Sequence, residues 1–222
     1  EQLWDRKVLS GPNLEVFQAA CFDFYYKKTL SRINNYHKKH GIKDQTTLIN
    51  KVRVPSISYM LNFINWDKIN SGIPSIFHGD LQFDNVLLKD DGGFLLLDWR
   101  QDFSGIVDYG DQYYDISKLN GGLQVSYKLI KQDQFRFYEN DQGEITVEHN
   151  PPEELVSAKR ILSEFIEEKN LDKAKIEIMT SLIYLNMSPM HHAPFNHFIY
   201  NFGKLSLYNA LLKYSQMSAD SF

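Results

Sequence analysis

Three polar residues stand beside short apolar runs in the middle of this sequence. Asp80 precedes Asn85 by five positions, and Asn85 precedes Asp98 by thirteen. The apolar runs Val86–Leu88 and Phe94–Leu97 enclose a turn that contains two acids and two glycines, a pattern that predicts a β-hairpin. Such a hairpin would bring Asn85 and Asp98 side by side, and we expect the carboxylate of Asp80 to lie beside them.

The chemistry that suits these three side chains is phosphoryl transfer. Its transition state needs positioning and charge neutralisation more than covalent help from the protein. Mg²⁺ takes oxygen ligands, usually one or two carboxylates together with phosphate oxygens and water. Asp98 and Asn85 therefore suit the metal, and Asp80 is left to accept a proton from an attacking hydroxyl. A single aspartate would be interpreted as a solvated loop residue, so it is the joint spacing that favours a site.

A known family has the same pattern. His78-Gly79-Asp80, four further residues, Asn85 and an apolar run that ends in Asp98-Trp99 resemble the aminoglycoside phosphotransferase and choline kinase superfamily, relatives of the protein kinases. The resemblance is tight over residues 73–119, about a fifth of the chain. It implies that Asp80 is the catalytic base, that Asn85 and Asp98 bind Mg²⁺, that His78 supports the loop, and that ATP is the phosphoryl donor.

Two further residues of this segment have open roles. The resemblance implies that Asp111, an acid at the start of the next helix, binds the backbone of the catalytic loop. An N-cap of that helix is an equally good interpretation, and the two roles are compatible. Arg100 is less typical of the family, and it would either pair with Asp102 or reach a phosphate.

The remaining elements predict a mainly helical α+β fold, because most apolar side chains recur at helical spacing and two pairs of runs have hairpin signals. The expected helices are Leu14–His40, Ser56–Ile69, a segment from Asp111 to Asn120, Glu153–Lys169, Leu171–Met187 and Phe198–Tyr214. The expected strands are Ser75–Phe77, the two runs of the first hairpin, and Phe135–Tyr138 with Ile145–Val147 in a second small hairpin on the surface.

The resemblance makes residues 1–222 a single domain, the carboxy-terminal lobe of a kinase-like fold with its catalytic core at residues 73–119. A complete kinase of this kind also has an amino-terminal lobe, whose strands and lysine hold the ATP phosphates. Nothing before residue 14 is long enough to form that lobe. We therefore expect it to be absent from this chain, which is either a fragment of a larger enzyme that supplies the missing lobe or a fused domain, or a lone carboxy-terminal lobe that would hold nucleotide poorly. The start at Glu1 rather than at a methionine favours the fragment. Exposed apolar residues are expected where that lobe would dock.

The acceptor is expected to lie over the catalytic base, near Trp99, Tyr113 and His191. A choline-like or ethanolamine-like amino alcohol would need an aromatic cage, a sugar would need a polar cleft, and an aminoglycoside would need a broad acidic one. The first two rank ahead of the aminoglycoside. His191, His192 and His197 lack the spacing of a familiar zinc site, so no metal other than Mg²⁺ is predicted.

Composition limits the partners. The 222 residues include 24 basic and 28 acidic side chains, a net charge of −4, and neither sign forms a run that would predict a nucleic-acid or membrane partner. No apolar stretch approaches the ~20 residues that span a bilayer, and the single Cys21 fits a reducing compartment, so a cytoplasmic protein is expected.

The resulting hypothesis is an ATP-dependent phosphotransferase that phosphorylates a hydroxyl of a small polar molecule. The alternative is a catalytically silent, kinase-like binding module. A metal-dependent phosphoesterase ranks last, because it would usually need more ligands than this sequence places together.

Overall fold

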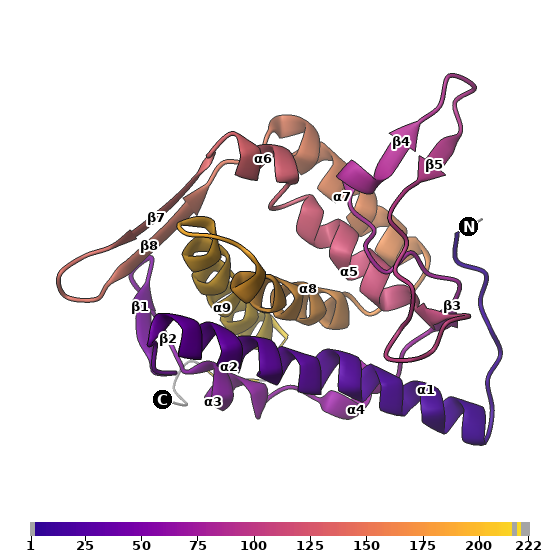
Figure 1. The fold of residues 1–222 in the computed structure, drawn as a ribbon, viewed down its shortest axis with the longest axis horizontal. Helices are drawn as coiled ribbons and strands as arrows, with labels where there is room; N and C mark the ends of the chain where they lie inside the picture. The colour runs from indigo at the N-terminus through magenta and orange to yellow at the C-terminus, as the bar shows by residue number, and fades with distance from the viewer. Residues whose placement is uncertain (1–2, 215–216, 219–222) are drawn as a thin grey trace.

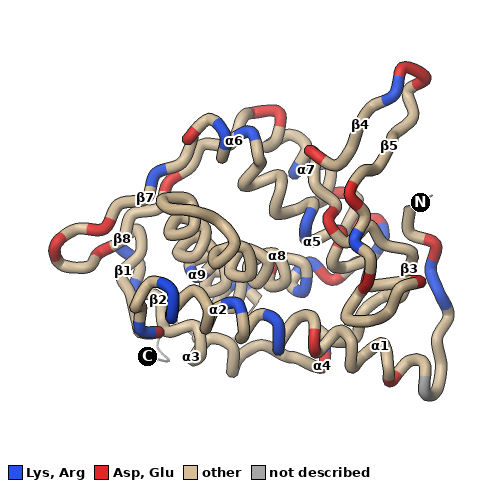
Figure 2. Tube along the Cα trace, viewed as in Figure 1, with Lys and Arg blue, Asp and Glu red and all other residues tan. Residues whose placement is uncertain are grey.

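The computed structural model describes residues 3–214 and 217–218. It has an α+β fold, about half helical, with one four-stranded sheet and two small two-stranded sheets (Figure 1). This confirms the mainly helical α+β class predicted from the sequence. Acidic and basic residues are spread over most elements (Figure 2). In the described part of the chain, no helix has the length and apolar character needed to cross a bilayer.

The first long helix is formed as predicted and runs along one side of the molecule (Figure 1). It consists of α1 (Pro12–Phe22), one π-helical segment η1 (Asp23–Lys27) and α2 (Lys28–His40). Gly41 ends it with φ 64°, a left-handed conformation that glycine adopts without steric cost. The helix therefore stops where the sequence indicated.

The three helices expected near the end of the chain are also present. They are α7 (Glu153–Glu168), α8 (Lys173–Met187) and α9 (Phe195–Lys213), and the short 3₁₀ turn η3 (Ser188–Met190) lies between the last two. A Cβ atom on Gly203 of α9 would lie 2.9 Å from the Cβ of Tyr184 on α8. The absence of a side chain at this position allows the two helices to pack closely.

The prediction of one helix over Ser56–Ile69 was wrong. The structure has two short helices, α3 (Ile57–Leu61) and α4 (Trp66–Asn70). The side chain of Asn65 accepts the backbone N–H of the third residue after it and starts α4 as an N-cap. An asparagine that caps a new helix in this way competes with continuation of the previous one.

The second predicted hairpin is part of a larger sheet. Its strands β7 (Phe135–Glu139) and β8 (Ile145–His149) are extended by a hairpin that the sequence analysis did not predict, β1 (Thr47–Ile49) and β2 (Val52–Val54), in the order β2-β1-β8-β7. The side chain of Asn50 joins the two hairpins, because it donates to Val147 O and accepts from Val147 N, both at 2.8 Å. The short helix α6 (Tyr127–Lys131) was also not predicted.

The first predicted hairpin is confirmed and projects from the body of the molecule (Figure 1). The 3₁₀ turn η2 (Phe83–Asn85) leads into β4 (Val86–Leu88), which pairs antiparallel with β5 (Phe94–Leu96). As expected, this region carries exposed apolar side chains: Phe83, Leu87, Leu88, Phe94, Leu95, Leu97 and Trp99. The predicted strand at Ser75–Phe77 is shorter, and β3 (Pro74–Ser75) pairs with β6 (Gly110–Asp111) just before α5 (Gln112–Gly122).

Candidate active site

The base of the hairpin brings Asn85 and Asp98 together. Val86 pairs with Leu96, and the N–H of Leu97 donates to the carbonyl of Asn85 at 2.9 Å. Asp98 follows directly, with φ 55°, and its side chain is exposed. The backbone therefore has the register from which the sequence analysis inferred that these two side chains are neighbours.

Asp80 lies against the same end of the hairpin. The Nδ2 group of Asn85 donates to the carbonyl O of Asp80 at 3.0 Å and to its Oδ2 at 3.3 Å. Among the described residues, neither Asn85 Oδ1 nor the carboxylate of Asp98 forms a hydrogen bond or ion pair of its own. The amide of Asn85 therefore contacts Asp80 directly, and the backbone of Asp98 follows the residue that pairs with Asn85.

A lysine that the sequence analysis missed binds Asp80 from the other side. The Nζ of Lys118, on α5, lies 2.7 Å from Asp80 Oδ1, and its side chain is only 12% exposed. Burial lowers the pKa of Lys118, but its interactions with Tyr114 and Asp80 outweigh burial and raise the pKa above the ordinary value. Lys118 is therefore a cation at neutral pH and fixes the orientation of the Asp80 carboxylate.

The backbone of the loop is held by Asp115 rather than by Asp111. The fully buried carboxylate of Asp115 accepts N–H groups from His78 at 2.7 Å and Gly79 at 2.8 Å, and the indole N–H of Trp4 at 3.1 Å. Burial raises the pKa of Asp115, and these hydrogen bonds oppose the rise. Asp115 thus has the loop-supporting role that the sequence analysis gave to Asp111.

Asp111 has the other of its two predicted roles, that of a helix cap. Its side chain accepts the backbone N–H of Tyr113 at 3.0 Å and so caps α5. It also accepts the N–H of Ile73 at 2.8 Å and the hydroxyl of Tyr25 at 2.7 Å. Asp111 therefore connects α5 to the segment before the loop and to the first helix. It supports the site through these elements and does not contact the loop backbone directly.

His78 is completely buried under the loop, as its predicted supporting role requires. Its Nδ1 accepts the backbone N–H of Asp80 at 3.2 Å, and its ring lies 5.0 Å from that of Trp99. Because Nδ1 accepts, the neutral ring carries its proton on Nε2, and this buried atom has no partner among the described groups.

Arg100 binds the backbone carbonyls of the loop. Its backbone N–H donates to His78 O at 2.9 Å, and its Nε donates to Gly79 O at 3.2 Å. A Cβ on Gly79, which has φ 79°, would lie 2.4 Å from the Cβ of Arg100, so only glycine fits here. The alternative pairing with Asp102 is not formed among the described residues, and the Asp102 carboxylate accepts the N–H of Gly105 at 2.7 Å.

The three predicted acceptor-binding residues have different surroundings. Trp99 is 44% exposed beside the loop, and its Nε1 donates to Leu96 O. The pKa of His191 is lowered by burial and by the positive charge of Lys118, which indicates that His191 lies on the Lys118 side of the site. Tyr113 does not fit its predicted role, because it is buried and its hydroxyl accepts the backbone N–H of Asp172 at 3.0 Å.

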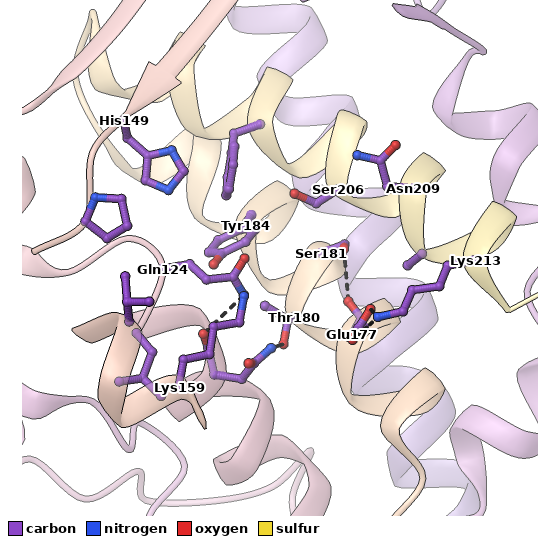
Figure 3. Close-up of a pocket in the computed structure, with 16 residues that line it drawn as sticks. Gln124, His149, Lys159, Glu177, Thr180, Ser181, Tyr184, Ser206, Asn209 and Lys213 are labelled. Atoms are coloured by element: carbon purple, nitrogen blue, oxygen red, sulfur yellow. Dashed lines mark hydrogen bonds and ion pairs between the residues drawn. The ribbon is translucent and has the colours of Figure 1, made fainter. Parts of the chain in front are cut away.

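A separate cavity of about 610 Å³ lies between α5, α7, α8 and α9 (Figure 3). None of the residues predicted for the site lines it. Its charged groups are Lys159, Glu177 and Lys213, and Lys213 Nζ binds both oxygens of Glu177, at 2.8 and 3.0 Å. Tyr184 and Phe202 form part of the wall. The cavity carries no arrangement of acid, base and free ligand oxygens comparable to that around Asp80.

The residues that could hold a metal ion at the base of the hairpin are Asn85 and Asp98. The described residues contain no group of three or more His, Cys, Asp or Glu side chains placed to share a metal ion. A cation at the hairpin base would have Asp98 and the Oδ1 of Asn85 as its protein ligands, and would take its others from phosphate oxygens and water, as Mg²⁺ commonly does.

Comparison with known proteins gives no assignment for this chain: no protein-family model, no curated protein and no solved structure matches it. Its function is therefore argued from the site alone.

Proposed function

We propose that this chain is the catalytic part of an ATP-dependent phosphotransferase, a kinase-like carboxy-terminal lobe that phosphorylates a hydroxyl of a small polar molecule. The observation that carries the proposal is the arrangement at the hairpin base. The carboxylate of Asp80 is oriented by both Asn85 and Lys118, and the hairpin register brings the backbone of Asp98 next to that of Asn85, so that Asn85 Oδ1 and the Asp98 carboxylate would be the ligand oxygens. Phosphoryl transfer needs this combination of a metal site and a positioned base.

Each residue has a distinct part in the proposed reaction. Asp98 and Asn85 would hold Mg²⁺, which supplies neutralisation of the phosphate charge. Asp80 receives the proton of the acceptor hydroxyl and orients that hydroxyl toward the phosphorus. Lys118 keeps the Asp80 carboxylate in place, and Asp115 and Arg100 fix the backbone that carries it. The exposed apolar hairpin fits a surface on which a nucleotide-binding lobe packs.

One observation favours the alternative of a catalytically silent binding module. Asp80 Oδ1 is engaged with Lys118 at 2.7 Å, so this oxygen is not free to take a proton while the ion pair persists. The longer contacts of Oδ2, 3.3 Å from Asn85 and 3.4 Å from Gln82, leave that oxygen as the proton acceptor. We therefore rank the phosphotransferase first.

The experiment is ADP release from Mg-ATP by the complete protein, with choline, ethanolamine, simple sugars and an aminoglycoside as acceptors. Asp80→Asn is expected to lower acceptor-dependent turnover by about 10²–10⁴-fold, the range for loss of a general base. Asp98→Ala is expected to weaken Mg-ATP binding first. Asp91→Asn, at the exposed tip of the same hairpin, is the matched control and should keep the wild-type rate. Wild-type rates in both site variants would refute the proposal.

A further inference from the structure

Lys and Arg positions recur along α2 (Figure 2), and the side chain of Lys28, at its start, lies close to that of Arg100. Lys28 Nζ lies 3.8 Å from the centroid of the Phe24 ring. Arg100 Cζ lies 5.3 Å from the same centroid and 5.9 Å from that of Tyr114. The Phe24 and Tyr114 rings touch edge to face, with centroids 4.8 Å apart. Lys28 and Arg100 are therefore held over one aromatic pair.

These cations lack acidic partners. Among the described residues, neither Lys28, Arg32 nor Arg100 forms an ion pair with an acid, whereas Lys118 is paired with Asp80. Lys28 and Arg32 are partly buried, and Arg100 is exposed. Partly buried cations that are crowded by like charges are unfavourable unless an anion neutralises them. Asp102 attracts Lys28 without forming an ion pair with it, so most of the positive charge of the cluster is left without a partner among the described residues.

The state of Lys28 agrees with this. Burial lowers its pKa to about 7, and the positive charges of Arg100, Arg32 and Lys118 add to the effect, with Asp102 opposing them. The negative charge of a bound anion would raise the pKa of Lys28 and favour its protonated form. Lys28 is therefore expected to gain a proton when an anionic ligand binds.

Arg100 links this cluster to the candidate base. Its Nε donates to the carbonyl O of Gly79, the residue before Asp80, at 3.2 Å. Lys118, which is paired with Asp80 at 2.7 Å, is also one of the positive charges that lower the pKa of Lys28. The cluster therefore lies next to the loop that carries Asp80.

We propose that the acceptor carries an oxyanion group, as in a phosphorylated sugar or polyol, which Lys28, Arg32 and Arg100 bind while its hydroxyl lies at Asp80. This inference rests on the proposed function. The hydroxyl oxygen forms a bond to the γ-phosphorus of ATP, the bond from that phosphorus to ADP breaks, and the hydroxyl proton passes to Asp80. Choline and aminoglycosides, which are cations, would be repelled by the cluster, so the order of acceptors expected from the sequence changes.

Paired acceptors that differ only in the anion test the inference: glucose against glucose 6-phosphate, and ribitol against ribitol 5-phosphate. The phosphorylated member of each pair is expected to have the higher kcat/KM. Lys28→Met should raise its KM about tenfold or more, the effect of losing a charged hydrogen bond, with the KM for Mg-ATP within about twofold. Lys27→Met is the matched control, because this neighbouring lysine is exposed and paired with Asp23 at 2.6 Å.

Binding of inorganic phosphate, measured by calorimetry, gives a readout that does not depend on turnover. Wild-type protein and Lys27→Met should bind phosphate alike, and Lys28→Met about tenfold more weakly. Equal binding by all three, or a raised KM for Mg-ATP in Lys28→Met, would overturn the anionic acceptor site. Turnover of the neutral acceptors alone would overturn it while leaving the phosphotransferase in place. Lys28-dependent phosphate binding without any acceptor-dependent turnover would remove the proposed function and the acceptor role with it.

Discussion

Removal of the Asp115 carboxylate should destabilise the whole chain. Asp115→Ala would leave two buried donors, the N–H groups of His78 and Gly79, and the partly buried indole N–H of Trp4 without this acceptor. Each unsatisfied buried group costs about 1–3 kcal/mol. The substitution also removes the cost of burying this carboxylate, the same burial that raises its pKa. We therefore expect the free energy of unfolding to fall by about 3–5 kcal/mol, the lower part of the summed range for three donors.

The assay is thermal and denaturant unfolding followed by circular dichroism. For a chain of 222 residues, a loss of this size lowers Tm by about 6–20 °C. Asp115→Asn keeps the shape and one accepting oxygen, and should lie between wild type and Asp115→Ala. Asp91→Asn, at an acid on the exposed hairpin turn that accepts the N–H of Gly93 at 2.9 Å and pairs with exposed Lys89 at 3.1 Å, should leave Tm almost unchanged. If Asp115→Ala unfolded at the wild-type midpoint, the carboxylate would not hold the loop.

Three more substitutions test the packing and the charges. Gly203→Ala should lower the free energy of unfolding by about 1–3 kcal/mol through overpacking, because the new Cβ would lie 2.9 Å from the Cβ of Tyr184. An unchanged denaturation midpoint would contradict the close helix contact. The native pKa of Lys28, about 7, lies below its ordinary value of 10.5. Between about pH 7 and pH 10.5 Lys28 is therefore protonated in the unfolded state but mostly neutral in the folded state. Because the unfolded state binds more protons over this range, the free energy of unfolding rises with pH. Lys28→Met should flatten that rise in urea titrations, and an identical rise would count against a desolvated Lys28. Tyr113→Phe should cost about 1 kcal/mol and leave turnover within about twofold, whereas a large loss of turnover would restore its predicted acceptor role.

The parts of the fold that were predicted are those set by local patterns. Helical spacing and Gly41 define the long first helix, and the turn composition defines the β4–β5 hairpin. The break between α3 and α4 was missed because one side-chain cap, that of Asn65, overrides an apolar pattern that continues across it. The pairing of β1 with β8 was missed because it joins residues far apart in sequence through a single register pair, Ile49 with Ile145.

The candidate site divides in the same way. The spacing was enough to predict the hairpin register that brings the backbone of Asp98 next to that of Asn85, and the contact of Asn85 with Asp80. Asp115 and Lys118 reach the loop from α5 across more than thirty residues of sequence, and only the rotation of that helix decides which acid faces the loop. Asp115 and Lys118 are three residues apart and therefore share a helix face. The sequence could have indicated that both face the loop, if Asp115 rather than Asp111 had been chosen as the loop-supporting acid.

The conformation of Asp98 bears on the choice between an enzyme and a silent module. With φ 55° it occupies the left-handed region, which glycine adopts more easily than a residue with a Cβ. Within the described part of the chain its carboxylate makes no hydrogen bond or ion pair, and its side chain is exposed. The carboxylate therefore contributes little to the fold, and its place directly after Leu97, whose N–H donates to Asn85 O, suits a metal ligand. Aspartate tolerates the left-handed region better than most residues, so the exposed and unpartnered carboxylate, rather than backbone strain, is what agrees with the proposed phosphotransferase.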